Sequence, residues 1–97
     1  MAIPLKKFAE RCESMAIQKG AISPLTSASV SLYDISRDWR RLHKATDFKS
    51  DSFEGWSEKE ECAANLIIST LVYLRRIKCR DVEKLLREKL DNQCSEL

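Results

Sequence analysis

Carboxylate and amide side chains are the residues of this 97-residue sequence whose types and spacing best suit metal chemistry. Asp34 lies inside one apolar-patterned segment, and Glu58 and Glu61 lie at the start of another. Asn65 follows Glu61 by four residues, so the two share one face if that segment is helical. Carboxylate and amide oxygens are the ligands that magnesium takes from proteins. If the two segments pack side by side as antiparallel helices, these four side chains could converge on one ion.

The same acidic residues also have a purely structural interpretation. Acidic side chains in the first turn of a helix are stabilised by the positive end of the helix dipole. Ser57 and Glu60 have the spacing of a capping box, in which each side chain binds the backbone of the other residue. Spacing alone therefore favours a helix start at Ser57 over a metal site.

Two basic clusters are candidates for binding phosphate groups. They end two of the predicted helices and consist of Arg37, Arg40, Arg41, His43 and Lys44, and of Arg75, Arg76, Lys78 and Arg80. Basic side chains at helix ends also complement the helix dipole. Antiparallel helices would hold the two clusters at opposite ends, which disfavours a continuous nucleic-acid surface. The net charge of +2 is also too small to indicate a polyanion, so nucleic acid is not an expected partner.

Apolar residues that recur every three or four positions predict a single all-α domain of four helices. The predicted helices cover residues 4–19, 24–43, 58–77 and 81–92, and residues 93–97 are expected to fray. With only two glycines and two prolines, the sequence has too few turn residues for a sheet of many short strands. The fold class is therefore a four-helix bundle spanning residues 1–97.

The predicted second helix carries a narrow apolar stripe suited to packing along another helix. The stripe consists of Leu25, Ala28, Leu32, Ile35, Trp39 and Leu42, so Trp39 is expected in the core. The predicted third helix is uncharged from residue 62 to residue 74, which indicates a central helix or one that packs against a second copy. We therefore expect a homodimer or higher homo-oligomer that pairs through these two helices.

Between these helices lies a loop, residues 45–56, that is too aromatic for a free linker. Phe48, Phe53 and Trp56 are expected to fold back onto the core or to line a pocket. Trp56 is the best candidate for stacking on a bound base, because aromatic rings stack on planar ligands.

The cysteines and the apolar segments bear on the cellular compartment. None of the four cysteines forms a C-x-x-C pair, so we expect no zinc knuckle, and Cys12 and Cys62 fall on apolar faces as reduced thiols. Residues 1–7 lack the apolar stretch of a secretory signal. The uncharged run of the third helix is shorter than the roughly 20 residues that a membrane span needs. These features predict a cytoplasmic protein without a membrane partner.

Three stretches of the chain follow one another in a recognisable order. They cover residues 31–40, around Asp34 and Trp39, residues 60–68, around Glu61 and Asn65, and residues 81–92, which end in Lys89 and Asn92. This order resembles the MazG-like family of all-α nucleoside triphosphate pyrophosphohydrolases. The resemblance implies a dimeric helical bundle that holds magnesium and cleaves a nucleoside triphosphate to a monophosphate and pyrophosphate.

The resemblance also assigns roles to residues of this chain. It implies Asp34 and Glu61 as catalytic residues, which would hold magnesium together with Asn65 and Glu58. Lys89 and Asn92 would meet the phosphates of a nucleotide.

The acidic motifs of the chain depart from the family pattern. Where the family has E-x-x-E this chain reads Ser31-x-x-Asp34, and where the family has E-x-x-D it reads Cys62-x-x-Asn65. The loss of these carboxylates weakens a magnesium site, since the negative ligands supply most of its attraction for the ion. Two interpretations stay open: a divergent pyrophosphohydrolase in which Glu61 and Glu58 stand in, and an inactive helical scaffold or protein-interaction module.

Overall fold

In the computed structural model, four helices make up the regular structure of residues 3–20, 22–23 and 27–95, which are the residues the structure describes. The helices are α1 (Leu5–Gln18), α2 (Ala28–Lys44), α3 (Glu58–Arg76) and α4 (Val82–Ser95). Within these ranges there is no strand, only an isolated bridge between Lys49 and Ser57. The predicted all-α class is confirmed. The helix predicted to end at residue 92 continues to Ser95, so the predicted fraying begins too early.

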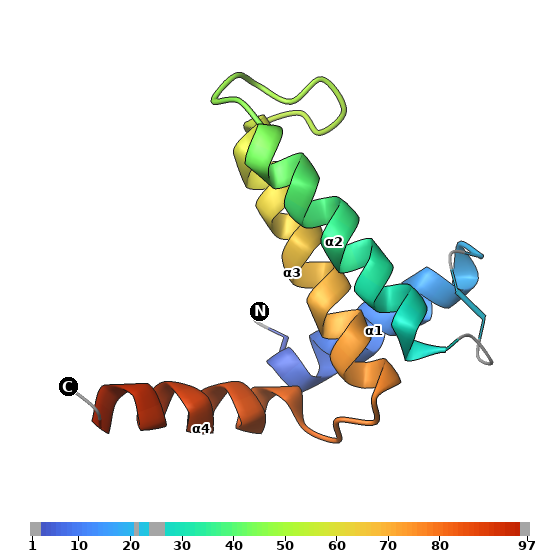
Figure 1. Cartoon of the computed structure of the whole chain (residues 1–97), viewed down its shortest axis with the longest axis vertical. Helices are drawn as coiled ribbons and strands as arrows, with labels where there is room; N and C mark the ends of the chain where they lie inside the picture. The colour runs from blue at the N-terminus through green and yellow to red at the C-terminus, as the bar shows by residue number, and fades with distance from the viewer. Residues whose placement is uncertain (1–2, 21, 24–26, 96–97) are drawn as a thin grey trace.

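The helices α2 and α3 form an antiparallel pair that stands on a base formed by α1 and α4 (Figure 1). α3 begins where the sequence predicts, because Ser57 and Glu60 form the capping box. The Ser57 hydroxyl accepts a hydrogen bond from the Glu60 N–H at 3.1 Å, and the Glu60 carboxylate accepts one from the Ser57 N–H at 3.1 Å. α3 ends before Lys78, whose φ of 70° does not continue a right-handed helix.

The buried apolar core lies where α1 crosses the C-terminal half of α3. It consists of Ala9, Cys12, Ile22, Leu71, Val72 and Val82. Glu13 of α1 stabilises this crossing, because its carboxylate accepts hydrogen bonds from Arg75 at 3.2 Å and from Arg76 at 3.3 Å. The core is small, and it positions α1 at an angle to the α2–α3 pair.

The face that α2 turns toward α3 differs from the predicted apolar stripe. Ser31 and Asp38 are buried, at 2 % and 4 % exposure, whereas Leu32 and Trp39 are 49 % and 55 % exposed. Asp38 accepts a hydrogen bond from the hydroxyl of Ser69 on α3, so this turn of α2 faces α3 with its polar side. One residue corresponds to about 100° around a helix, so this contact rotates the predicted stripe to the flank. The expectation that Trp39 lies in the core is therefore wrong, and its ring stacks on His43 instead.

The loop between α2 and α3 does not pack onto the core. The aromatic rings of Phe48, Phe53 and Trp56 are exposed, so the expectation that they fold onto the core is wrong. The stripe of α4 contributes Val82 to the core and leaves Leu85, Leu86 and Leu90 exposed.

Cys12 is buried as expected, and all four thiols are free. Within the described residues, no helix combines the length and the apolar character needed to cross a bilayer.

Candidate functional site

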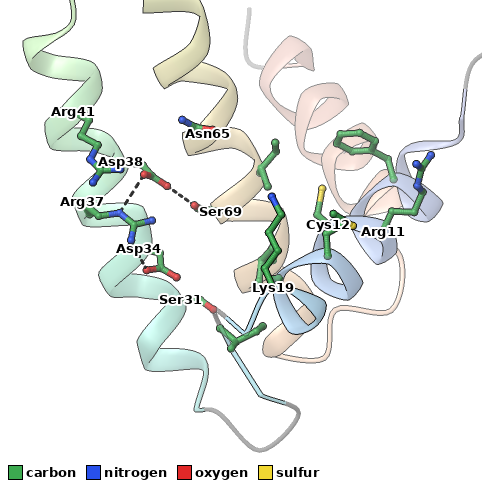
Figure 2. Close-up of a pocket in the computed structure, with 16 residues that line it drawn as sticks. Arg11, Cys12, Lys19, Ser31, Asp34, Arg37, Asp38, Arg41, Asn65 and Ser69 are labelled. Atoms are coloured by element: carbon green, nitrogen blue, oxygen red, sulfur yellow. Dashed lines mark hydrogen bonds and ion pairs between the residues drawn. The ribbon is translucent and has the colours of Figure 1, made fainter. Parts of the chain in front are cut away.

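A pocket of about 560 Å³ opens in the angle between α1 and the α2–α3 pair. Figure 2 shows α2 and α3 on one side of this pocket and α1 on the other. The lining combines apolar side chains, including Phe8, Met15 and Ile68, with charged and amide groups from all three helices. Pockets of this volume hold small organic ligands.

The α2 side of the pocket carries two aspartates joined by one arginine. The guanidinium of Arg37 lies 3.3 Å from a carboxylate oxygen of Asp34 and 3.4 Å from one of Asp38. The second oxygen of Asp38 accepts the hydrogen bond from Ser69, as the dashed lines of Figure 2 show. Both carboxylates are therefore engaged by side chains of the chain itself.

Ser31 is a polar residue of the pocket that the fold leaves without a partner. Its side chain is 2 % exposed, lines the pocket, and has no hydrogen-bond partner for its hydroxyl among the described residues. A buried hydroxyl without a partner costs about 1–3 kcal/mol. The packing of α2 against α3 therefore leaves one polar group beneath the pocket wall unsatisfied.

Three cations of the pocket are also unpaired. Arg11 of α1, Lys19 at its C-cap and Arg41 of α2 line the pocket and form no ion pair within the part of the chain that the structure describes. With Arg37, the lining holds four basic side chains against two aspartates. The pocket is therefore positively charged overall and attracts an anion.

A thiol on the apolar wall bears on the chemistry that the pocket can support. Burial raises the pKa of Cys12 above its ordinary value, although nearby Arg11 offsets part of this rise. The neutral thiol is a poor nucleophile, since the thiolate is the reactive form. Cys12 therefore acts as a small apolar wall residue.

The structure brings together only some of the residues that the sequence singles out. Asp34 and Asn65 line the same pocket. The contact between Asp38 and Ser69 marks one level of the antiparallel α2–α3 pair. Glu61 precedes Ser69 by eight residues, which is about 12 Å along α3. Asp34 precedes Asp38 by four residues, which is about 6 Å along α2 in the opposite direction. Within one chain, Asp34 and Glu61 are therefore separated along the helix pair.

Glu58 and Glu61 serve the loop that precedes α3. Glu61 accepts hydrogen bonds from the hydroxyls of Ser50 at 2.6 Å and Ser52 at 2.9 Å, and Glu58 accepts one from the Thr46 N–H at 3.2 Å. Both carboxylates hold residues 46–52 against the start of α3.

The other predicted ligand-binding residues lie outside the pocket. Lys89 and Asn92 are exposed on α4, and Trp56 stacks on Phe53 in the exposed part of the loop. None of the three lines the pocket between α1, α2 and α3.

Magnesium is the metal that the resemblance implies, and the donors of the pocket do not fit it. In residues 3–20, 22–23 and 27–95, no three His, Cys, Asp or Glu side chains are grouped so that they could hold a metal ion. The single guanidinium of Arg37 pairs with both Asp34 and Asp38 and offsets one of their two negative charges. A magnesium site needs several uncompensated oxygen ligands.

Sequence reasoning did not single out Asp38, Arg11 or Lys19 as residues of the site. It named Ser31 only as the position of a lost carboxylate. Asp38 follows Asp34 by four residues, so their shared helical face was a usable signal. Ser31 gave no such signal, because its isolation depends on the packing of α2 against α3.

Comparisons with protein-family models, with curated proteins and with solved structures found no match.

Proposed function

We propose that this chain is a divergent MazG-like domain that binds a nucleoside phosphate in the pocket between α1 and the α2–α3 pair. The observation that carries the proposal is a set of unpaired cations, Arg11, Lys19 and Arg41, that share a pocket with an apolar wall. This combination suits a ligand with one anionic end and one flat, weakly polar end. The choice of a nucleoside phosphate among such ligands rests on the family resemblance.

Each part of the ligand has a partner of suitable chemistry. The guanidinium of Arg41 and the ammonium of Lys19 donate charge-assisted hydrogen bonds to phosphate oxygens. Phe8 and Ile68 offer apolar surface to the base, and aromatic rings favour stacked contacts. The amide of Asn65 lines the same pocket and can hydrogen-bond polar groups of the sugar or the base.

The proposal is for binding without the magnesium-dependent cleavage of the family. Glu58 and Glu61 are engaged by the loop, and Arg37 pairs with both Asp34 and Asp38. The described part of the chain therefore offers no cluster of free carboxylates to hold an ion beside the phosphates. The homodimer expected from the sequence is compatible with this proposal, because the pocket is formed within one chain and needs no second copy.

A second candidate function is a helical protein-interaction module without a small ligand. The exposed apolar side chains of α4, Leu85, Leu86 and Leu90, favour it. Exposed apolar stripes of this kind are typical of surfaces that dock another helix.

Calorimetric titration with nucleoside tri-, di- and monophosphates and with pyrophosphate tests the proposal. We expect binding that is unchanged when magnesium is removed by a chelator, with no release of pyrophosphate. Arg41→Ala should weaken binding about tenfold, because it removes a charge-assisted hydrogen bond.

The matched control is Arg40→Ala, which removes the neighbouring guanidinium. Arg40 is exposed and bonds only the Ser36 carbonyl oxygen, outside the pocket. Binding that is equal in the two variants, or absent in the wild type, would overturn the proposal in favour of the interaction module. Magnesium-dependent pyrophosphate release that Asp34→Asn abolishes would contradict the non-hydrolytic part.

A further inference from the structure

A second, smaller cavity lies where α1 meets the end of α3, and we infer that it binds the phosphate dianion of a small molecule. Its volume is about 310 Å³, and it is lined by Glu13, Arg75, Lys78, Cys79 and Arg80. We call it the turn pocket, because three of these residues belong to the turn between α3 and α4 (Figure 1). The inference goes beyond the proposed function, since the turn pocket shares no residue with the pocket between α1 and the α2–α3 pair.

The lining of the turn pocket carries a net positive charge. Arg75, Lys78 and Arg80 supply three positive charges, and Glu13 supplies one negative charge, which leaves two positive charges. The carboxylate of Glu13 is also shared, because it lies 3.2 Å from Arg75 and 3.3 Å from Arg76. Lys78 and Arg80 form no ion pair among the described residues. Unpaired like charges on one wall repel each other, so the pocket attracts an anion.

Asp81, the acid that follows Arg80 in the chain, does not neutralise this charge. Its carboxylate accepts a hydrogen bond from the Lys84 N–H at 3.0 Å and so caps the first turn of α4. Asp81 does not line the turn pocket. Lys78 and Arg80 are therefore left for a ligand from solution.

The backbone conformation of Lys78 is a second observation that points to a role for its side chain. α3 ends in a Schellman motif, in which the Cys79 N–H donates to the Leu74 carbonyl oxygen at 2.9 Å. The Lys78 N–H donates to the carbonyl oxygen of Arg75 at 3.0 Å. The motif holds Lys78 at a φ of 70°, in the left-handed region. Glycine usually fills this position, because it has no Cβ to clash with the backbone.

A lysine at this position makes the fold less stable than a glycine would. The other described residues with φ in the left-handed region are both glycines, Gly20 at 74° and Gly55 at 92°. A residue with a Cβ is strained in this region. At Lys78 the strained residue places a cation on the wall of the turn pocket. Strain of this kind is concentrated at sites that bind or react.

A phosphate dianion matches the turn pocket better than a single carboxylate does. Its two negative charges equal the net charge of the lining, and its oxygens can accept hydrogen bonds from three cations at once. Guanidinium groups donate paired hydrogen bonds to phosphate, and a lysine acts as a point charge. The bond from Arg75 to Glu13 uses only the Nε–H, one of the five donors of a guanidinium.

Two-dimensional NMR of the full chain, titrated with inorganic phosphate at constant ionic strength, tests the site. We expect the backbone amide signals of Lys78 and Cys79 to shift and to saturate. Arg80→Ala should raise the dissociation constant read from these signals about tenfold, because it removes charge-assisted hydrogen bonds. The matched control is Arg40→Ala, which removes an exposed guanidinium outside both pockets and should leave this constant unchanged.

Lys78→Gly separates the two consequences of the lysine. In chloride buffer without phosphate, this variant should be more stable than the wild type, with an equilibrium constant for unfolding about fivefold lower, because the backbone strain is relieved. Its dissociation constant for phosphate should nevertheless rise about tenfold, because a cation of the pocket is lost. Chemical denaturation with and without phosphate measures both effects, since a ligand that binds the folded state stabilises it.

The same titration with glycerol phosphate identifies the form of the ligand. Tighter binding than that of inorganic phosphate indicates a phosphate ester, and weaker binding indicates the free ion. Unshifted signals at Lys78 and Cys79, or equal phosphate affinities in Arg80→Ala and Arg40→Ala, would overturn the inference. A Lys78→Gly variant that binds phosphate as tightly as the wild type would also overturn it.

Failure of this inference is distinguishable from failure of the proposed function. Arg41→Ala is expected to weaken nucleotide binding in the pocket between α1 and the α2–α3 pair. It should not change the phosphate titration of the Lys78 and Cys79 signals, since Arg41 does not line the turn pocket. Phosphate shifts that Arg41→Ala abolishes and Arg80→Ala preserves would assign the anion to the other pocket and overturn the inference.

Discussion

At the scale of single residues, the site is defined by which polar groups have partners and which do not. Asp34 and Asp38 share Arg37, and Ser69 donates a hydrogen bond to Asp38. The hydroxyl of Ser31 differs from these carboxylates, because it is buried beside the same pocket and has no partner among the described residues. Engaged carboxylates and a free hydroxyl indicate a binding pocket more than a metal centre.

The unpaired hydroxyl predicts an unusual effect of Ser31→Ala. Without ligand, this variant should unfold at higher denaturant concentration than the wild type, since a buried unpaired polar group is removed. Ser36→Ala on the exposed side of α2 serves as the control, because it gives only the gain in helix propensity. We expect Ser31→Ala to exceed this control by about 1 kcal/mol in the free energy of unfolding. A Ser31→Ala protein less stable than the control would show that the hydroxyl has a partner.

The thiols give a second test at this scale. Cys12 is buried, its pKa is raised by that burial, and Cys94 is exposed on α4. A thiol-modifying reagent at neutral pH should therefore label Cys94 first and Cys12 last, because the reactive thiolate is both scarcer and less accessible at Cys12. Mass spectrometry of partially modified protein identifies the order. Modification of Cys12 before Cys94 would contradict the described packing of α1.

At the scale of helices, sequence reasoning succeeded where the determinants are local. The start of α3 follows from Ser57 and Glu60, which bind each other's backbone within one turn. The face of α2 could not be predicted, because Asp38 meets Ser69 thirty-one residues away in the chain. That polar contact turned Leu32 and Trp39 outward against the apolar pattern.

The residues of the site likewise divide into those with local signals in the sequence and those placed by contacts between distant parts of the chain. Asp34 and Asn65 were predicted because residue type and helical spacing are visible in the sequence. The loop contacts that engage Glu58 and Glu61 depend on the path of residues 46–52, which no periodicity predicts. The apolar wall and the cations of α1 depend on the angle at which α1 crosses α3.

The crossing of α1 over α3 predicts that Glu13→Ala is destabilising. Its carboxylate pairs with Arg75 and Arg76 across the two helices, and these side chains are mostly buried. Its removal should cost about 2 kcal/mol in the free energy of unfolding, since charged hydrogen bonds at a packed crossing are lost. Glu10→Ala on the same helix is the control, with an expected effect within about 0.5 kcal/mol. Equal effects in chemical denaturation would contradict the role of Glu13.

At the scale of the whole molecule, the chain is more open than a compact monomer. Its radius of gyration is 14.8 Å, against about 12.5 Å for a compact domain of 97 residues. The pocket opens in the angle between α1 and the α2–α3 pair, and Leu32 and Trp39 of α2 are exposed outside it.

The most direct test of the account follows the nucleotide into the pocket by two-dimensional NMR. A nucleoside triphosphate added without magnesium should shift the backbone amide signals of Ser31, Arg41 and Asn65, and the side-chain amide of Asn65. The indole signal of Trp39, which does not line the pocket, should stay in place. Shifts confined to α4 and the loop, or no shifts at saturating ligand, would contradict the claim that this pocket binds a nucleoside phosphate.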